Sequence, residues 1–225
     1  MEKTPAKAAR FFTLSLICVT AALLNRLMHF LAFDTLGLPL FVDTVFTAAV
    51  TFYAGLIPGL VTILLVHMHW SFFIYSSFFA VANFSPFTIV SIVEVIIIWR
   101  LRPNTGTAWP GARGRRAFAE SICICTGLML LYIAASVSAS VSGGLIDYIG
   151  FTRTELANRP FFTPNDVFRA EFYGSNFHPL AVAILSRFPI NLIDRFIVIS
   201  GGFFIAVGLG KIGDKIRRRQ KKQPD

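Results

Sequence analysis

Residues 11–33 read FFTLSLICVTAALLNRLMHFLAF, and this stretch decides the class of fold. It carries one formally charged side chain, Arg26, and exceeds the roughly twenty residues that a helix needs to cross the hydrocarbon core of a membrane. Long apolar segments recur along the 225-residue chain, which is 55% hydrophobic and 15% charged. A soluble domain of this length has too little interior for so much apolar surface. The sequence therefore predicts an all-α, polytopic membrane protein.

The apolar segments and their flanking prolines predict a six-transmembrane-helix bundle that forms a single integral membrane domain over residues 1–225. The spans are expected at about 11–33, 40–56, 59–79, 86–101, 117–145 and 189–211. Ser85 and Pro86 suit the first turn of the fourth span, and Pro189 suits that of the sixth. Residues 146–188 combine balanced charge with several aromatic rings, which predicts a structured external cap between spans five and six.

Three cationic clusters predict how the bundle faces. They hold fifteen of the 21 Lys and Arg residues: Lys3, Lys7 and Arg10; Arg100, Arg102, Arg113, Arg115 and Arg116; and Lys211, Lys215, Arg217, Arg218, Arg219, Lys221 and Lys222. Cationic residues that flank membrane spans are retained in the cytoplasm. We therefore expect a multi-pass protein of the cytoplasmic (inner) membrane, with both termini and the basic tail 212–225 inside. The net charge of +9 then indicates contact with the lipid bilayer rather than with nucleic acid.

Three polar residues of the sixth span lie on one helix face. Asn191, Asp194 and Arg195 are spaced i, i+3 and i+4, and the predicted span places them near its outer end. Two interpretations stay open from the sequence. The three side chains bind a small polar solute at the mouth of the bundle, or they make hydrogen bonds between helices.

Other ionisable residues of the spans have simpler expected roles. Arg26 and Asp43 are predicted to form a structural ion pair across the first hairpin, whereas Glu94 falls in the cytoplasmic half of span four, away from the outer site. His67 and His69 point to different faces of a helix, so hydrogen-bonded neutral histidines are expected rather than a metal site. No nucleotide-binding loop or catalytic motif occurs, which predicts a chain with no catalytic residues, no metal and no cofactor.

The layout and two motifs resemble the substrate-binding (S) components of energy-coupling factor (ECF) transporters. The Gly55-Leu56-Ile57-Pro58-Gly59 turn is similar to the glycine-rich turn between spans two and three of that family. Pro189-Ile190-Asn191-Leu192-Ile193-Asp194-Arg195 resembles the proline–asparagine start of its last helix. Glu2 stands where the metal-selective members carry a histidine, which argues against nickel or cobalt as cargo.

The resemblance implies a membrane-embedded substrate-capture subunit of an ATP-driven importer for vitamins or similar micronutrients. A small-molecule substrate would bind on the outer side, and a membrane coupling subunit with cytoplasmic ATPase subunits would supply the energy. The substrate-binding residues would then be Asn191, Asp194 and Arg195, together with Trp70, Tyr75, Asn83 and Tyr173.

Two other functions remain open on the sequence. The first is a multi-span membrane sensor. The second is a scaffold protein of the envelope, in which the small residues of span five would form docking faces for other proteins instead of packing inside the bundle.

Overall fold

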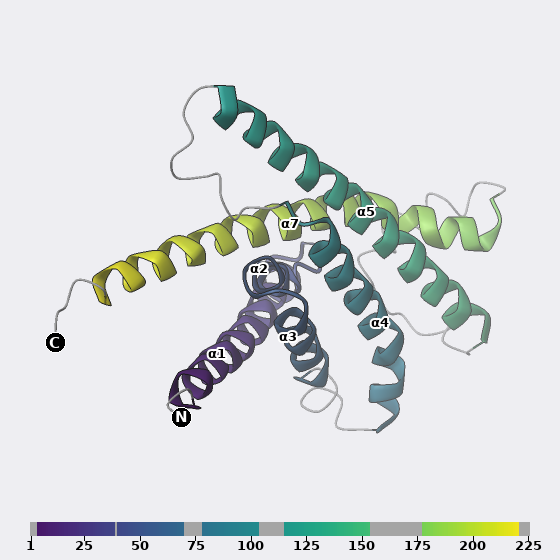
Figure 1. Ribbon diagram of the computed structural model, residues 1–225. Coiled ribbons are helices and arrows are strands. Elements are labelled where there is room, and N and C mark those ends of the chain that lie inside the picture. The colour runs from purple at the N-terminus through teal and green to yellow at the C-terminus, as the bar shows by residue number, and fades with distance from the viewer. Residues whose placement is uncertain (1–3, 39, 70–77, 104–114, 154–176, 221–225) are drawn as a thin grey trace.

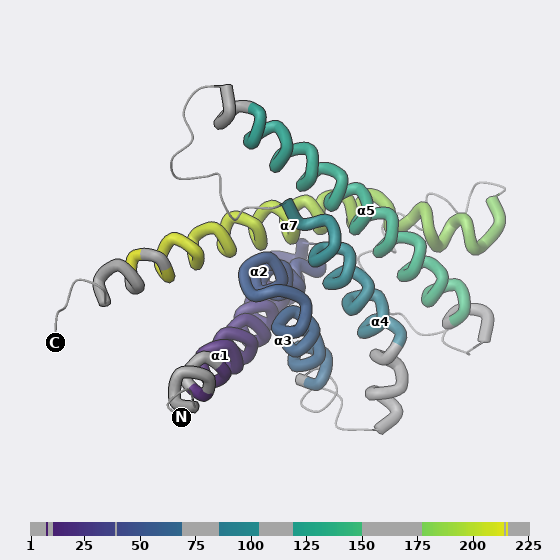
Figure 2. Tube along the Cα trace, viewed as in Figure 1, coloured from purple at the N-terminus to yellow at the C-terminus, as the bar shows by residue number. Residues whose placement is uncertain are grey.

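The computed structural model describes residues 4–38, 40–69, 78–103, 115–153 and 177–220 (Figures 1 and 2), and these residues fold almost entirely into helices. In chain order the elements are α1 (Thr4–His29), a short π-helical segment η1 (Phe30–Thr35), α2 (Val45–Ala54), α3 (Leu56–His69), α4 (Phe78–Leu101), α5 (Arg115–Arg153) and α7 (Pro179–Gln220). The described residues contain no strand. The expected all-α architecture and its six helices are therefore found.

Three segments are long and apolar enough to cross a membrane, namely Phe11–Thr35, Ala119–Ile149 and Pro179–Gly213. Val45–Ala54 and Leu56–Met68 are shorter apolar helices. Large apolar side chains on one face of α1 are exposed, namely Phe12, Leu16, Val19, Leu23 and Leu27. Such a face suits contact with lipid, and the molecule is a membrane-embedded protein.

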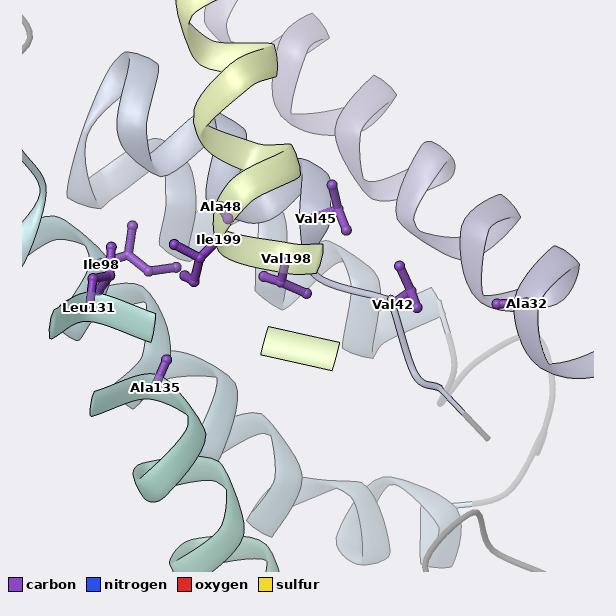
Figure 3. Packing of buried hydrophobic residues seen from close by; sticks show 9 residues of the cluster. All are labelled: Ala32, Val42, Val45, Ala48, Ile98, Leu131, Ala135, Val198 and Ile199. Carbon is purple, nitrogen blue, oxygen red and sulfur yellow. The ribbon is translucent and has the colours of Figure 1, made fainter. Parts of the chain in front are cut away.

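The short helix α2 lies in the middle of the bundle. It packs against α1, α3, α4 and α7, and Figure 1 shows it almost end-on between α1, α3 and α7. Buried residues from η1, α2, α4, α5 and α7 meet around it in one apolar cluster (Figure 3). The cluster consists of Ala32, Val42, Val45, Ala48, Ile98, Leu131, Ala135, Val198 and Ile199. Elements far apart in the sequence are therefore held together through α2.

Arg102 of the second cationic cluster and Gly213, which lies within the stretch of the third, both approach the same end of α2. Arg102, just after α4, lies with its Nη1 3.4 Å from the carbonyl oxygen of Thr51. On α7, a Cβ added to Gly213 would lie 3.6 Å from the hydroxyl of Tyr53. The ends of α4 and α7 thus approach the last turn of α2 together. This arrangement is the one required if both clusters lie on one side of the membrane; which side they face stays a prediction.

Several helix boundaries differ from those expected. The sixth span was expected to begin at Pro189, but α7 begins ten residues earlier at Pro179, and Pro189 lies inside it. Likewise Pro86 lies inside α4, which begins at Phe78. Both starting points were wrong, because a proline is tolerated inside an apolar helix whose freed backbone groups find other partners.

Parts of the predicted external cap and tail belong to the long helices. Residues 146–153 continue α5 and residues 179–188 belong to α7, while residues 154–176 lie outside the described part of the chain. The tail expected over 212–225 is helical as far as Gln220. The long helices of the bundle therefore extend into segments that composition alone marks as polar.

The second span was expected to begin at about residue 40, yet residues 40–44 are not helical and α2 begins at Val45. We call residues 40–44 the linker. It is followed by α2 and then by the turn at Gly55, whose φ of +98° favours glycine. The linker contacts the buried charged residues of α7, whereas the turn lies beside Arg102.

Candidate functional site

The polar residues of α7 lie on one buried face in the first half of the helix. Arg187, Asn191, Asp194 and Arg195 are spaced at i, i+4, i+7 and i+8, and between 0% and 8% of each residue is exposed. Asp194 lies fifteen residues after Pro179, or about 22 Å along the helix axis. These side chains therefore lie inside the candidate membrane span Pro179–Gly213 and not at its first turns, as the shorter predicted span implied.

Arg195 is the centre of a buried ionic network. Its Nη1 donates to both carboxylate oxygens of Glu94 at 2.5 Å and to Oγ1 of Thr44 at 3.0 Å. Its Nη2 lies 3.2 Å from Oδ2 of Asp194. The network joins α4, the linker and α7, because a buried guanidinium needs charged or polar partners for its several N–H groups.

The expected separation of Glu94 from the α7 cluster is wrong. Glu94 lies seven residues before the end of α4 at Leu101, or about 10 Å along the axis from that end. Because α7 begins ten residues earlier than predicted, Arg195 also lies several turns inside its helix. The two side chains consequently meet inside the bundle.

Polar backbone groups of the linker form hydrogen bonds with side chains of α1 and α7. The amide of Val42 donates to Oδ1 of Asp194 at 2.8 Å, and Nδ1 of His29 lies 3.1 Å from the carbonyl oxygen of Phe41. Irregular backbone at membrane depth persists only where such partners are available or where water reaches it. Asp194 thus holds the linker and is itself fully buried.

The N-terminus of α2 is capped from a neighbouring helix. Asn25 of α1 accepts a hydrogen bond from the amide of Phe46 at 2.8 Å and donates one to Oγ1 of Thr47 at 2.8 Å. The first amides of a helix have no partner inside it, so this contact replaces a local cap. Asn25 and Asp194 together fix where the linker ends and α2 begins.

Val42 adopts a backbone conformation that is unusual for its residue type. Its φ is +40°, a region that a β-branched residue rarely occupies. The residue is buried and takes part in the apolar cluster of Figure 3. The surrounding contacts therefore impose this conformation, and they fix the direction of the next residue, Asp43.

Asp43 is the least buried of the three acidic residues of this region. It is half-buried, whereas Glu94 and Asp194 are buried. Asp43 lies close enough for its charge to act on His67, Glu94, Asp194 and Arg195. Two carboxylates, those of Glu94 and Asp194, therefore contact the guanidinium of Arg195, and Asp43 adds a third acidic residue nearby.

Asn191 and α5 are joined by hydrogen bonds. Nδ2 of Asn191 donates to Oγ of Ser140 at 3.0 Å, and Oγ of Ser136 lies 3.5 Å from the carbonyl oxygen of Asn191. Ser140 itself donates to the carbonyl of Ser136 at 2.8 Å. All three residues are buried, so Asn191 bonds between helices, as one of the two sequence interpretations has it.

A second ion pair joins α5 to α7. Nε and Nη2 of Arg187 donate to the two carboxylate oxygens of Asp147, at 2.7 and 2.8 Å. The guanidinium also lies 5.5 Å from the ring centroid of Phe87 on α4. Bidentate geometry of this kind is stronger and more specific than a single contact. The sequence did not lead to this pair, because both residues fall in the segment predicted as external cap. The available signal was helical spacing: Asp147 shares a helix face with Ser140, and Arg187 shares one with Asn191.

His67 bonds to a neighbouring helix, since its Nε2 lies 3.2 Å from Oγ of Ser91 on α4. This contact agrees with the expected hydrogen-bonded histidine. No group of His, Cys, Asp and Glu suited to a metal ion occurs among the described residues. The side chain of His69 lies outside them.

The remaining predicted site residues are not placed. Trp70, Tyr75 and Tyr173 lie outside the described residues, and Asn83 belongs to α4 with a side chain that is likewise outside them. The Arg26–Asp43 ion pair stays a prediction.

Searches for related proteins add no family to this picture. Neither a protein-family model, nor a curated protein, nor a solved structure matches the chain.

Proposed function

We propose that this chain is the substrate-capture subunit of an ATP-driven importer of vitamin-like micronutrients, and that it binds its solute from the outer side of the membrane. The resemblance to S components of energy-coupling factor transporters motivates the proposal. Within it, a membrane coupling subunit and cytoplasmic ATPase subunits are the partners.

One observation of the structure supports the proposal most directly, namely an irregular linker that meets buried charges inside an apolar bundle. Val42 donates to Asp194, and Thr44 accepts from Arg195, in the first half of α7. Charged side chains inside a membrane are energetically costly, and where they occur they usually mark a pathway for a solute or an ion. Broken backbone beside such charges is the usual form of a binding site in membrane transporters.

An envelope scaffold is the second candidate, and the bonding of the α7 residues favours it. Asn191, Asp194 and Arg195 all bond to protein atoms, so their polarity is used at least in part to hold helices together. In a scaffold no solute would be retained. A membrane sensor would retain a solute without recruiting ATPase subunits.

Purification from native membranes separates these functions. An affinity-tagged full-length chain, solubilised in mild detergent, is expected to carry a stoichiometric small molecule that mass spectrometry detects after denaturation. It is also expected to co-purify with a membrane subunit and with proteins that hydrolyse ATP. Membranes without the tagged chain provide the control.

The outcomes point to different functions. A retained small molecule without ATPase partners would support the sensor and refute the importer. Absence of both the small molecule and the partners would leave the scaffold.

A further inference from the structure

The exposed face of α7 changes from apolar to cationic at the end of its candidate membrane span. We propose that the cationic part of this face, which begins with Lys211 and Lys215, binds the headgroups of anionic phospholipids. This inference goes beyond the proposed function and does not depend on it. Three observations carry it: the direction of the face, the order of its side chains along the helix, and the length of α7.

The contacts of two glycines show which face of α7 points toward α2. A Cβ on Gly202 would lie 2.7 Å from Cβ of Ala48. A Cβ on Gly213 would lie 3.6 Å from the hydroxyl of Tyr53. The two glycines are eleven residues, or about three turns, apart and so share one face. Lys211 lies nine residues, or about two and a half turns, after Gly202, so it points away from α2.

The face that points away from α2 is apolar inside the candidate span. Ile193 is 57% exposed and Phe204 is 67% exposed. A Cβ added to Gly208 would meet no atom within 4 Å, so the helix is open to its surroundings there. Phe204 lies about two turns before Lys211 and about three turns after Ile193, so all three share this face. An exposed apolar face inside a span suits contact with lipid acyl chains.

The same face becomes cationic at the end of the span. Lys211 and Lys215 are one turn apart and both are exposed. The helix continues beyond them, and its spacing adds Arg218 and Arg219 to this face. Residues 211–219 carry five cationic residues and one acid. Figure 1 shows this last, yellow part of α7 projecting beyond the other helices, so the face is accessible.

The length of α7 places the two lysines among the lipid headgroups. The candidate span Pro179–Gly213 has 35 residues and is about 52 Å long. Even at a tilt of about 40° it covers about 40 Å along the bilayer normal, more than the hydrocarbon core of about 30 Å. Its cationic end is the end that is costly to keep in the core. The exposed ring of Tyr53 beside Gly213 marks the same level, because tyrosines are enriched at membrane interfaces.

An anionic phospholipid is the ligand that this order of side chains fits. A lipid whose acyl chains lie along Ile193 and Phe204 has its headgroup at the level of Lys211 and Lys215. Each lysine has three N–H donors, and the phosphate oxygens of the headgroup are acceptors. A zwitterionic headgroup also carries a positive charge that the lysines repel. The face therefore selects lipids with net negative charge.

Titration of the purified full-length protein with single lipids, followed by native mass spectrometry, tests the inference. Phosphatidylglycerol and phosphatidylcholine with identical acyl chains are the probes. Each lysine near an anionic surface contributes about five-fold, so we expect the anionic lipid to bind about twenty-five-fold more tightly. Lys211→Gln and Lys215→Gln are each expected to lower this preference about five-fold. The double replacement of both lysines by arginine should retain it.

Arg153→Gln is the control, because it removes one positive charge at the other end of α7. Arg153 ends α5, six residues after Asp147, which pairs with Arg187. Arg187 lies twenty-four residues, or about 36 Å along the helix axis, before Lys211. This variant should therefore leave the lipid preference unchanged.

Three results would overturn the inference. The first is equal binding of the two lipids by the natural chain, which needs no variant to fold. The second is a preference that the two glutamine variants leave unchanged, or that Arg153→Gln lowers as much as they do, since net charge alone would then explain it. The third is an acidic protein that co-purifies with the natural chain and is released by Lys211→Gln while the lipids bind equally, which would assign the face to a protein partner.

Discussion

Gly202 lies where α7 passes close to α2, and its replacement by alanine gives a direct test of this packing. A Cβ at this position would lie 2.7 Å from Cβ of Ala48, 3.0 Å from the amide nitrogen of Ala49 and 3.1 Å from the carbonyl oxygen of Val45. Nonbonded carbon atoms prefer separations of about 3.5–4.0 Å. Two of the three neighbours are backbone atoms, so the helices themselves must separate by roughly 1 Å to accept the methyl group.

The size of the expected loss of stability follows from a comparison of Gly202→Ala with Gly208→Ala. Both glycines lie within α7, but a Cβ at Gly208 would meet no atom within 4 Å. Alanine stabilises a helix relative to glycine by about 1 kcal/mol, and this gain is common to both variants. The difference between them is therefore the cost of overpacking, about 1–3 kcal/mol. At about 2–4 °C per kcal/mol for a chain of this length, Gly202→Ala should unfold roughly 2–12 °C below Gly208→Ala.

Thermal unfolding of the two purified variants in the same detergent, followed by intrinsic tryptophan fluorescence, measures this difference. Gly208→Ala is expected to unfold at or slightly above the temperature of the natural chain. If Gly202→Ala unfolded at the same temperature as Gly208→Ala, or above it, the close approach of α2 and α7 would be refuted.

Three further substitutions test the polar contacts by the same thermal unfolding measurement. Arg195→Met should cost about 3–5 kcal/mol because it leaves buried carboxylates without a counter-ion, and adding Glu94→Gln should recover part of the loss; a double variant less stable than the single one would contradict the network. Asn25→Ala should cost about 1–2 kcal/mol through loss of the α2 cap, and unchanged stability would argue against that cap. Arg187→Lys should cost about 1–2 kcal/mol because lysine cannot make the bidentate contact with Asp147, so a neutral result would rule that geometry out.

The sequence was sufficient for the class of the molecule and for the presence of its helices. Apolar runs such as residues 11–33 are too long for a buried core helix of a small soluble domain, so composition and length lead to membrane helices directly. Helix ends were less predictable. Pro86 and Pro189 look like starting points, yet both lie inside helices, because the preference of proline for a first turn is weaker than the cost of exposing unpaired backbone groups in an apolar environment.

The candidate site was predictable only in part. Asn191, Asp194 and Arg195 were identified by their spacing on one helix face, which is a local property. Their partners were not, since Glu94 lies 101 positions from Arg195 and Val42 lies 152 positions from Asp194. A shift of ten residues in the start of α7 was enough to move the predicted site from the first turns of the helix to well inside it.

Residues 11–33 and the later apolar runs by themselves determined that this chain folds as helices in a membrane, because burial of apolar surface depends on composition and length. Only the tertiary structure decided that the linker is irregular, that Asp194 holds it and that Glu94 joins Arg195. Ion pairs and backbone caps between distant elements depend on which side chains the packing of α2, α4 and α7 brings within a few ångströms. No local sequence pattern predicts which of these distant side chains come into contact.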